Sequence, residues 1–309
     1  MTGVQTCALP IWDNLQLRPN EYAIMLKGVE VAKAEVLPGH VLAIDPGTAQ
    51  RGMVQGIPTK EPAFGLPALW VAEDQREQAQ MAGYTVVDAS SAITTHLSEI
   101  IKRHGHELLG RQEAQALLDE VGKTHPKLVE ELIPTMVSLG TVVRILGNLL
   151  KEGIPIRDIR SILEAIADHA MTTKDAELLT EMARQSLART ITKQYQAPDG
   201  SLPVITLDPR LDRSLAEQAA TLPQGAVLNL DPALSHKLLT ALKQSAERVA
   251  ARGQQPILLC SPAVRRHLRR LTDRLLHSVP VVGLNEIDAM VRLQSLDTIR
   301  LDSELPQPS

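Results

Sequence analysis

The histidines are the first residues whose spacing could support chemistry. His104 and His106 lie close together, and His96 lies about two helical turns upstream. A metal site needs several ligands that converge on one point, and only Glu99 and Glu107 stand nearby. Histidines isolated at a protein surface are common. We therefore interpret these histidines as a solvated helix end, and we expect neither a metal site nor a cofactor.

Two aspartates stand where an α/β sheet would hold a ligand. Asp208 and Asp231 each follow a predicted strand, so a nucleotide-binding or receiver-like domain centred on residues 204–282 is one hypothesis. However, each aspartate precedes a proline, which suits a residue that caps a helix. The sequence also contains no phosphate loop and no GxGxxG, HExxH or GxSxG motif. We favour the capping role and a protein that is not an enzyme.

Arginines form the strongest charge cluster. They lie on a helix that Ser261 and Pro262 should begin: Arg265, Arg266, Arg269, Arg270 and Arg274. Nucleic-acid binding would also require interleaved aromatic side chains and a basic domain. The chain has 2% aromatic residues and a formal net charge of −4. The cluster therefore predicts a solvated face or a contact with an acidic neighbouring subunit, and no nucleic-acid partner.

The only phenylalanine, Phe64, lies in a segment that its backbone makes stiff. Pro62 and Pro67 each fix φ near about −65°, and Gly65 frees the backbone between them. Such a kinked platform presents an aromatic ring and suits docking better than turnover. A single large apolar residue is more often part of a core. From these residues alone, both interpretations stay open.

Composition limits the class of protein. The 309 residues are 44% hydrophobic and 22% charged, which is globular and leaves room for roughly two or three domains. Cys7 and Cys260 are far apart and show no metal-ligand spacing, which fits a reducing compartment. No apolar run approaches the roughly 20 residues of a membrane span.

Hydrophobic periodicity divides the chain into three regions. Residues 14–106 mix strands and helices, residues 111–194 are helical, and short apolar runs alternate with helices after a turn at 196–201. The sequence therefore predicts an α/β multidomain fold with an α+β first lobe, an all-helical middle subdomain and an α/β C-terminal subdomain with a mostly parallel sheet. The predicted strands are 21–31, 41–44, 69–72, 84–87, 204–207, 226–230, 256–259 and 279–282.

The first eleven residues, MTGVQTCALPI, resemble the translation of a widely used sequencing adapter. We treat residues 1–12 as an artefactual leader and exclude them from the fold, as is done for processing segments. We expect the natural protein to continue upstream of residue 13.

Several motifs, in the same order, resemble one family: the flagellar and type III secretion export-gate proteins, known as FHIPEP. The resemblance runs from about residue 13 to about residue 191 and fades beyond. The sequence is more similar to the flagellar members than to their virulence-secretion counterparts, which remain an alternative. The matching stretches include Met25 to Glu30, Asp45 to Thr48, Pro62 to Trp70, Tyr84 to Ser90, Thr95 to Leu97, Gly110 to Asp119, Pro126 to Pro134 and Pro155 to Ala170.

This resemblance implies the cytoplasmic part of a longer protein whose N-terminal half lies in the cell inner membrane. The implied domains are residues 13–39 plus 89–109 (a first subdomain, truncated at its N-terminus), 40–88 (an inserted second), 110–194 (a helical third), 195–301 (an α/β fourth) and 302–309 (a disordered tail). Members form a homo-oligomeric ring, expected to be a nonamer.

The resemblance also implies a docking site for export chaperones that carry their cargo. Its residues would be Glu61, Phe64, Val87, Ala92 and Thr95, around a hydrophobic dimple with an acidic rim. Relatives often have Asp in place of Glu61 and a larger aliphatic residue in place of Ala92. The implied function is a docking platform that passes substrates to the membrane channel, with the export ATPase complex and other export-gate proteins as further partners.

Overall fold

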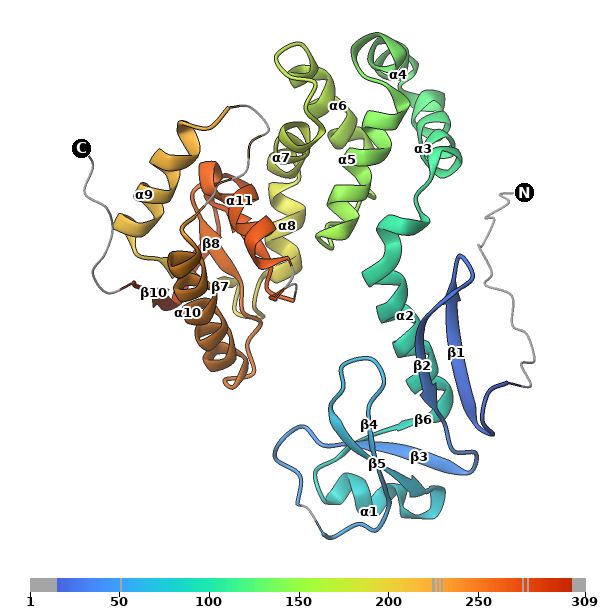
Figure 1. Ribbon diagram of the computed structural model, residues 1–309. Helices are drawn as coiled ribbons and strands as arrows, with labels where there is room; N and C mark the ends of the chain where they lie inside the picture. The colour runs from blue at the N-terminus through green and yellow to red at the C-terminus, as the bar shows by residue number, and fades with distance from the viewer. Residues whose placement is uncertain are drawn as a thin grey trace. The chain divides into compact units, whose positions relative to one another are not determined.

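The computed structural model describes residues 16–301, apart from 51, 224, 225, 227, 229, 274 and 277. The chain forms two compact units, Met1–His104 and Gly105–Ser309, which are described separately below (Figure 1). The expected mixed α/β class is confirmed, with antiparallel sheets in the first unit and a parallel sheet in the second. The leader and the tail after residue 301 lie outside the described residues.

The first unit begins with a hairpin. Strands β1 (Glu21–Leu26) and β2 (Val29–Glu35) pair antiparallel. The prediction of one bent strand over 21–31 is wrong, because the bend reverses the chain completely. Lys27 and Gly28 both have positive φ, 50° and 82°, the conformation that a two-residue hairpin turn requires.

A four-stranded antiparallel sheet follows, in the order β4-β5-β3-β6. The sequence predicted three of its strands to within a few residues and missed β4, a short edge strand that contains a proline. Pro58 fits there because proline cannot donate to a sheet ladder and is tolerated at edges. The strands are β3 (His40–Ile44), β4 (Ile57–Lys60), β5 (Pro67–Ala72) and β6 (Thr85–Asp88).

This sheet has an apolar core on each face, because successive side chains of a strand point to opposite sides. Val41 and Ala43 pack with Ala79 of α1 (Arg76–Met81), which follows the short helix η1 (Glu73–Gln75). Leu42 packs on the other face with Trp70 and with Ala92 of α2 (Ala89–Leu108). The two helices therefore cover opposite faces.

Asp88 begins α2. Its carboxylate accepts hydrogen bonds from the Ser91 N–H (2.6 Å) and the Ser90 hydroxyl (2.7 Å), and these bonds lower the pKa of Asp88 to about 2. The sequence also offers Ser90 and Ser91 as capping residues, but the aspartate at the end of β6, two or three residues earlier, supplies the acceptor.

The second unit begins with helices, as expected, and the residues described between 110 and 195 form no strand. The last part of this region forms two helices, which meet at Leu187. The elements are α3 (Arg111–Thr124), α4 (Pro126–Glu131), the short segment η2 (Leu132–Met136), whose backbone is extended at Ile133, α5 (Leu139–Lys151), α6 (Ile159–Ala170), α7 (Ala176–Ser186) and α8 (Ala188–Tyr195).

Among the described residues, no single helix has both the length and the apolar composition of a membrane span. The segments Pro126–Met136 and Leu139–Lys151 have the required length and apolar composition only when taken together, and the chain is bent by 107° at the break between them.

The parallel sheet has the order β10-β7-β8-β9. Its parallel character is confirmed, while β10 was missed because its sequence is polar and largely exposed. The strand expected at 226–230 includes residues 227 and 229, which lie outside the described residues. The elements are β7 (Ser201–Leu207), α9 (Pro209–Ala220), α10 (Pro232–Ala250), β8 (Leu258–Cys260), α11 (Pro262–Thr272), β9 (Val281–Gly283), η3 (Leu284–Glu286) and β10 (Arg292–Ile299).

One apolar core joins the helices to this sheet. Leu146 of α5 and Leu163 of α6 belong to the same buried cluster as Val204 of β7 and Leu259 of β8. A second cluster, which includes Leu258 of β8, holds α9, α10 and α11. The two regions predicted as separate third and fourth subdomains therefore share a core, which explains why they form one compact unit.

Candidate functional site

Phe64 lies in a tight turn between β4 and β5, and Glu61 fixes that turn. The Glu61 carboxylate accepts hydrogen bonds from the Ala63 N–H (2.8 Å) and from the Phe64 N–H (2.6 Å). The Glu61 carbonyl accepts from the Gly65 N–H (2.9 Å), and the Glu61 N–H donates to the Leu66 carbonyl (2.8 Å). Gly65 has a φ of +72°, which a side chain would strain. We call residues 61–66 the Phe64 turn.

The Phe64 ring is exposed. Its relative exposure is 64%, whereas that of Glu61 is 3%. The core interpretation of Phe64 is therefore wrong, and the platform interpretation fits. The expected acidic rim is also wrong for Glu61, because its buried carboxylate holds the backbone of the turn and does not face solvent.

The other predicted site residues lie on β6 and α2. Val87 pairs with Leu42 in the sheet and packs against the cluster of Trp70 and Ala92. Ala92 is buried, whereas Thr95, three residues further along α2, is exposed. The structure thus brings Val87 and Ala92 together, while Phe64 belongs to neither apolar cluster of this sheet.

Sequence reasoning missed an interaction between His96 and Tyr22. His96 is not solvated as predicted: it is buried, and its Nδ1 lies 2.7 Å from the Tyr22 hydroxyl. The two rings meet edge to face, with centroids 5.7 Å apart. The spacing of Ala92, His96 and Ile100, four residues apart, marks a buried helix stripe and could have revealed this.

Burial and the Glu61 charge act on both rings. Burial, with a smaller contribution from Glu61, raises the pKa of Tyr22 to about 12. Burial lowers the pKa of His96, and Arg103 lowers it further, while Glu61 opposes both effects. His96 is therefore neutral near pH 7. The described residues contain no group of three or more His, Cys, Asp or Glu side chains that could hold a metal ion.

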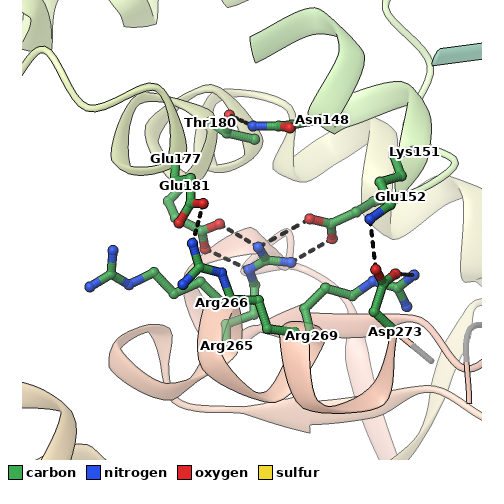
Figure 2. A pocket seen from close by; sticks show the side chains of 11 residues that line it. Asn148, Lys151, Glu152, Glu177, Thr180, Glu181, Arg265, Arg266, Arg269 and Asp273 are labelled. Atoms are coloured by element: carbon green, nitrogen blue, oxygen red, sulfur yellow. Dashed lines mark hydrogen bonds and ion pairs between the residues drawn. The ribbon is translucent and has the colours of Figure 1, made fainter. Parts of the chain in front are cut away.

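The arginine cluster proves to be partly a buried ionic cluster of the second unit (Figure 2). Arg265 is 2% exposed and bonds Glu152 (2.6 Å) and Glu181. Its predicted position on a solvated face is wrong, because acidic side chains of α5's C-terminal end and of α7 meet it. Arg274 lies outside the described residues.

A second guanidinium completes this buried cluster. Arg184 of α7 bonds Glu286 through two nitrogens (2.7 and 2.6 Å) and bonds Glu152 at 3.0 Å. Burial raises the pKa of Glu181. Burial would do the same to Glu152, but Arg184 and Arg265 outweigh it and lower the pKa of that carboxyl. We call Glu152, Glu181, Arg184, Arg265 and Glu286 the ionic cluster.

Arg265 lines a cavity of about 140 Å³. Figure 2 shows Lys151 and Arg269 paired with Asp273 at its edge, and Arg270 pairs with Glu177. The cavity lining offers ion pairs but no serine, cysteine or histidine nucleophile. These ion pairs join α5, α7 and α11.

The two aspartates behave as the capping hypothesis predicted. Asp208 accepts from the Arg210 N–H at the start of α9, and Asp231 accepts from the Ala233 and Leu234 N–H groups at the start of α10.

The comparisons with known proteins confirm the family indicated by the motifs, but the expectation that the resemblance fades beyond about residue 191 is wrong. A family model described as the FHIPEP family matches residues 1–292. The chain therefore belongs to the FHIPEP family, the export-gate proteins of flagellar and type III secretion systems. It is 42% identical to the flagellar biosynthesis protein FlhA of Bacillus subtilis over 297 residues, and 42% identical to FlhA of Escherichia coli over 289.

These matches cover 96% and 94% of this chain but only 44% and 41% of the two relatives. The chain thus spans less than half the length of the curated relatives it matches.

Solved structures show the same fold. The Chlamydia pneumoniae CdsV protein superposes with a TM-score of 0.82 at 28% identity, covering 93% of this chain and 83% of that one. The nonameric EPEC SctV-C superposes with a TM-score of 0.72, covering 91% and 84%. Its 22% identity makes it evidence for the fold alone.

Proposed function

We propose that this chain is the cytoplasmic docking platform of a flagellar export gate, where it receives chaperone–cargo complexes and passes the cargo to the membrane channel. The observation that carries the proposal is the exposed Phe64 ring on a turn fixed by buried hydrogen bonds. A large exposed aromatic side chain carried by a backbone that is already ordered suits a binding hot spot, because less conformational entropy is lost on binding.

The site proposed for docking keeps the five predicted residues with revised roles. Phe64 contacts the partner, Val87 and Thr95 border the contact, Glu61 shapes the turn, and Ala92 packs beneath. The role is non-enzymatic and needs no cofactor.

A flagellar system is favoured over a virulence-secretion system by the relatives. Identity to flagellar FlhA proteins reaches 42%, against 28–30% for the CdsV structures. The whole protein would lie in the inner membrane, with this part on the cytoplasmic side.

We further propose a homo-oligomeric ring, by analogy with the nonameric EPEC SctV-C, and contact with the export ATPase complex and other export-gate proteins. A complex of the CdsV relative with CdsO shows that a member of this fold binds a further protein.

Calorimetric titration of the chain with flagellar chaperone–cargo complexes tests the docking proposal. Phe64→Ala should weaken binding by about 2 kcal/mol, as for a central hot spot. Met81→Ala is the matched control, because Met81 is an exposed apolar side chain of the same unit, 85% exposed on α1. Unchanged binding by a folded Phe64→Ala variant would overturn the assignment.

A further inference from the structure

The β1–β2 hairpin adds little to the apolar core of the first unit. The side chains of residues 21–35 are half-buried or exposed, and none of them belongs to the apolar clusters of the described residues. Packing resumes directly after the hairpin, where Val36 and Leu37 contact the cluster of Leu42 and Trp70. Since β1 and β2 pair only with each other, they form a two-stranded sheet, which is marginally stable by itself.

One polar contact fastens this hairpin to α2, beside which it lies in Figure 1. The Tyr22 hydroxyl of β1 is 2.7 Å from Nδ1 of His96, and the two rings meet edge to face. Within the part of the chain that the structure describes, this is the only side-chain hydrogen bond or ion pair between residues 21–35 and a later element. The attachment of the hairpin therefore depends strongly on these two side chains.

This contact favours a neutral His96. The side chain is 4% exposed, and no carboxylate of the described residues bonds it, so a charge there would be buried without a partner. The charged and titratable groups that face His96 or act on its charge are Tyr22 on β1, Glu61 in the Phe64 turn and Arg103 on α2 itself. Burial lowers the pKa of His96 most, Glu61 opposes that effect, and Arg103 lowers the pKa further.

We propose that residues 21–35 form a flap anchored at Val36 and Leu37, that the Tyr22–His96 contact latches this flap onto α2, and that protonation of His96 releases it. A positive charge on the buried imidazole is unfavourable, and opening of the flap lets water solvate it. The flap therefore opens more often in acid. This switch lies within the first unit and does not depend on the docking function.

The pH range of the switch follows from the lowered pKa of latched His96. Because this pKa lies below that of an exposed histidine, about 6.5, the open flap binds the proton more readily than the latched flap does. The latch is at full strength above about pH 6.5 and weakens as pH falls towards the lower pKa. At pH 5 the open population can rise by up to about thirtyfold, the limit for a histidine that is protonated only when the flap is open.

Amide hydrogen exchange of the whole chain tests the flap, because a released two-stranded hairpin should lose its own backbone hydrogen bonds. Exchange is followed by mass spectrometry at about pH 8 and pH 5, and each rate is divided by the intrinsic rate of an unstructured amide at that pH. At the higher pH the amides of β1 and β2 should be less protected than those of β3 and β5. At the lower pH their protection should fall further, relative to β3 and β5.

Two variants assign that response. Tyr22→Phe keeps the ring and removes the hydroxyl, so it should lower the protection of the hairpin about fivefold at pH 8, the worth of one hydrogen bond. His96→Gln keeps a polar side chain without the titration, so it should abolish the pH dependence. Matched controls from the same unit are Tyr84→Phe, whose ring packs in the cluster on the other face of the sheet, and His40→Gln, whose Nδ1 faces the Pro38 carbonyl. Both controls should behave as wild type does.

A hairpin that is as well protected as β3 and β5 at both pH values would overturn the proposal. A pH dependence that persists in folded His96→Gln would overturn it as well, and its loss in His40→Gln instead would assign the switch to the wrong histidine. If the His96 and Tyr22 variants do not fold, the wild-type protein decides. Relative protection of the hairpin that is equal at pH 8 and pH 5 would then defeat the latch.

Discussion

Arg184 and Glu286 form a two-bond ion pair across 102 residues of chain, and each side chain is 2% exposed. The pair joins α7 to the short helix η3 that follows β9. Its parallel geometry is the one in which a guanidinium and a carboxylate bind most strongly. Without Arg184, the three carboxylates of the ionic cluster would share one guanidinium, that of Arg265, which lies 3.5 Å from Glu286.

Arg184→Ala should therefore destabilise the second unit strongly. We expect a loss of about 3–5 kcal/mol in the free energy of unfolding, because three carboxylates would then face one guanidinium in a buried cluster. Urea denaturation followed by circular dichroism measures the loss. Arg160→Ala is the control, since its ion pair with Glu164 is exposed and should be worth about 0.5 kcal/mol or less. Equal losses in the two variants would contradict a structural role for the ionic cluster.

Glu181→Gln should change how stability depends on pH. The ionic cluster has three carboxylates and two guanidinium groups, and burial raises the pKa of Glu181 above its unfolded value. The folded state then binds this proton more readily, so stability from Glu181 is fully present below the unfolded pKa and is lost as pH rises through the folded pKa. The variant should remove this loss.

Thermal unfolding of wild type and Glu181→Gln from about pH 4 upward measures that difference. The two melting curves should separate as pH rises, with the variant the more stable. Glu164→Gln, an exposed glutamate of the same unit, should follow wild type. A variant that loses stability only at the higher pH would show that ionised Glu181 is stabilising.

Gly65→Ala should strain the Phe64 turn. Gly65 has a φ of +72° with open space around its Cα, so the cost comes from the backbone alone and should be about 1–2 kcal/mol. Gly105→Ala is the opposite control: Gly105 lies inside α2 without a positive φ and with open space, and alanine there should stabilise by about 0.5–1 kcal/mol. Differential scanning calorimetry distinguishes the two signs, and a neutral Gly65→Ala would contradict the fixed turn.

Cys260 should be inert until the second unit opens. Its thiol is 3% exposed in β8, and burial raises its pKa, so little thiolate forms. In a Cys7→Ser background, labelling with a thiol reagent should follow urea unfolding and should be faster in Arg184→Ala. Rapid labelling of the native protein would place Cys260 nearer solvent than its burial indicates.

The sequence was sufficient for features set by local chemistry. Helix starts at Asp208 and Asp231 followed from an acceptor placed before proline, and the parallel sheet followed from short apolar runs separated by helices. The conformational freedom of Gly65, which lies between Pro62 and Pro67, indicated a turn with a fixed backbone conformation. Such signals lie within a few residues of the feature they specify.

The sequence was insufficient where distant residues decide the environment. Nothing near Arg265 shows that Glu152 and Glu181 approach it, so its charge appeared to require solvent. His96 likewise looked solvated because its bonding partner, Tyr22, lies 74 residues away. Strand β10 was missed for a related reason, since its polar sequence is held in place by pairing with β7.

The apolar cluster shared by α5, α6, β7 and β8 has a mechanical consequence. The helices and the sheet cannot separate without exposing the same set of leucines and valines, so the second unit should behave as one rigid body. Deeply buried amides of α5 and β8 should then exchange with deuterium through one common opening event. A force applied to the sheet should therefore be transmitted to helices α5 and α6.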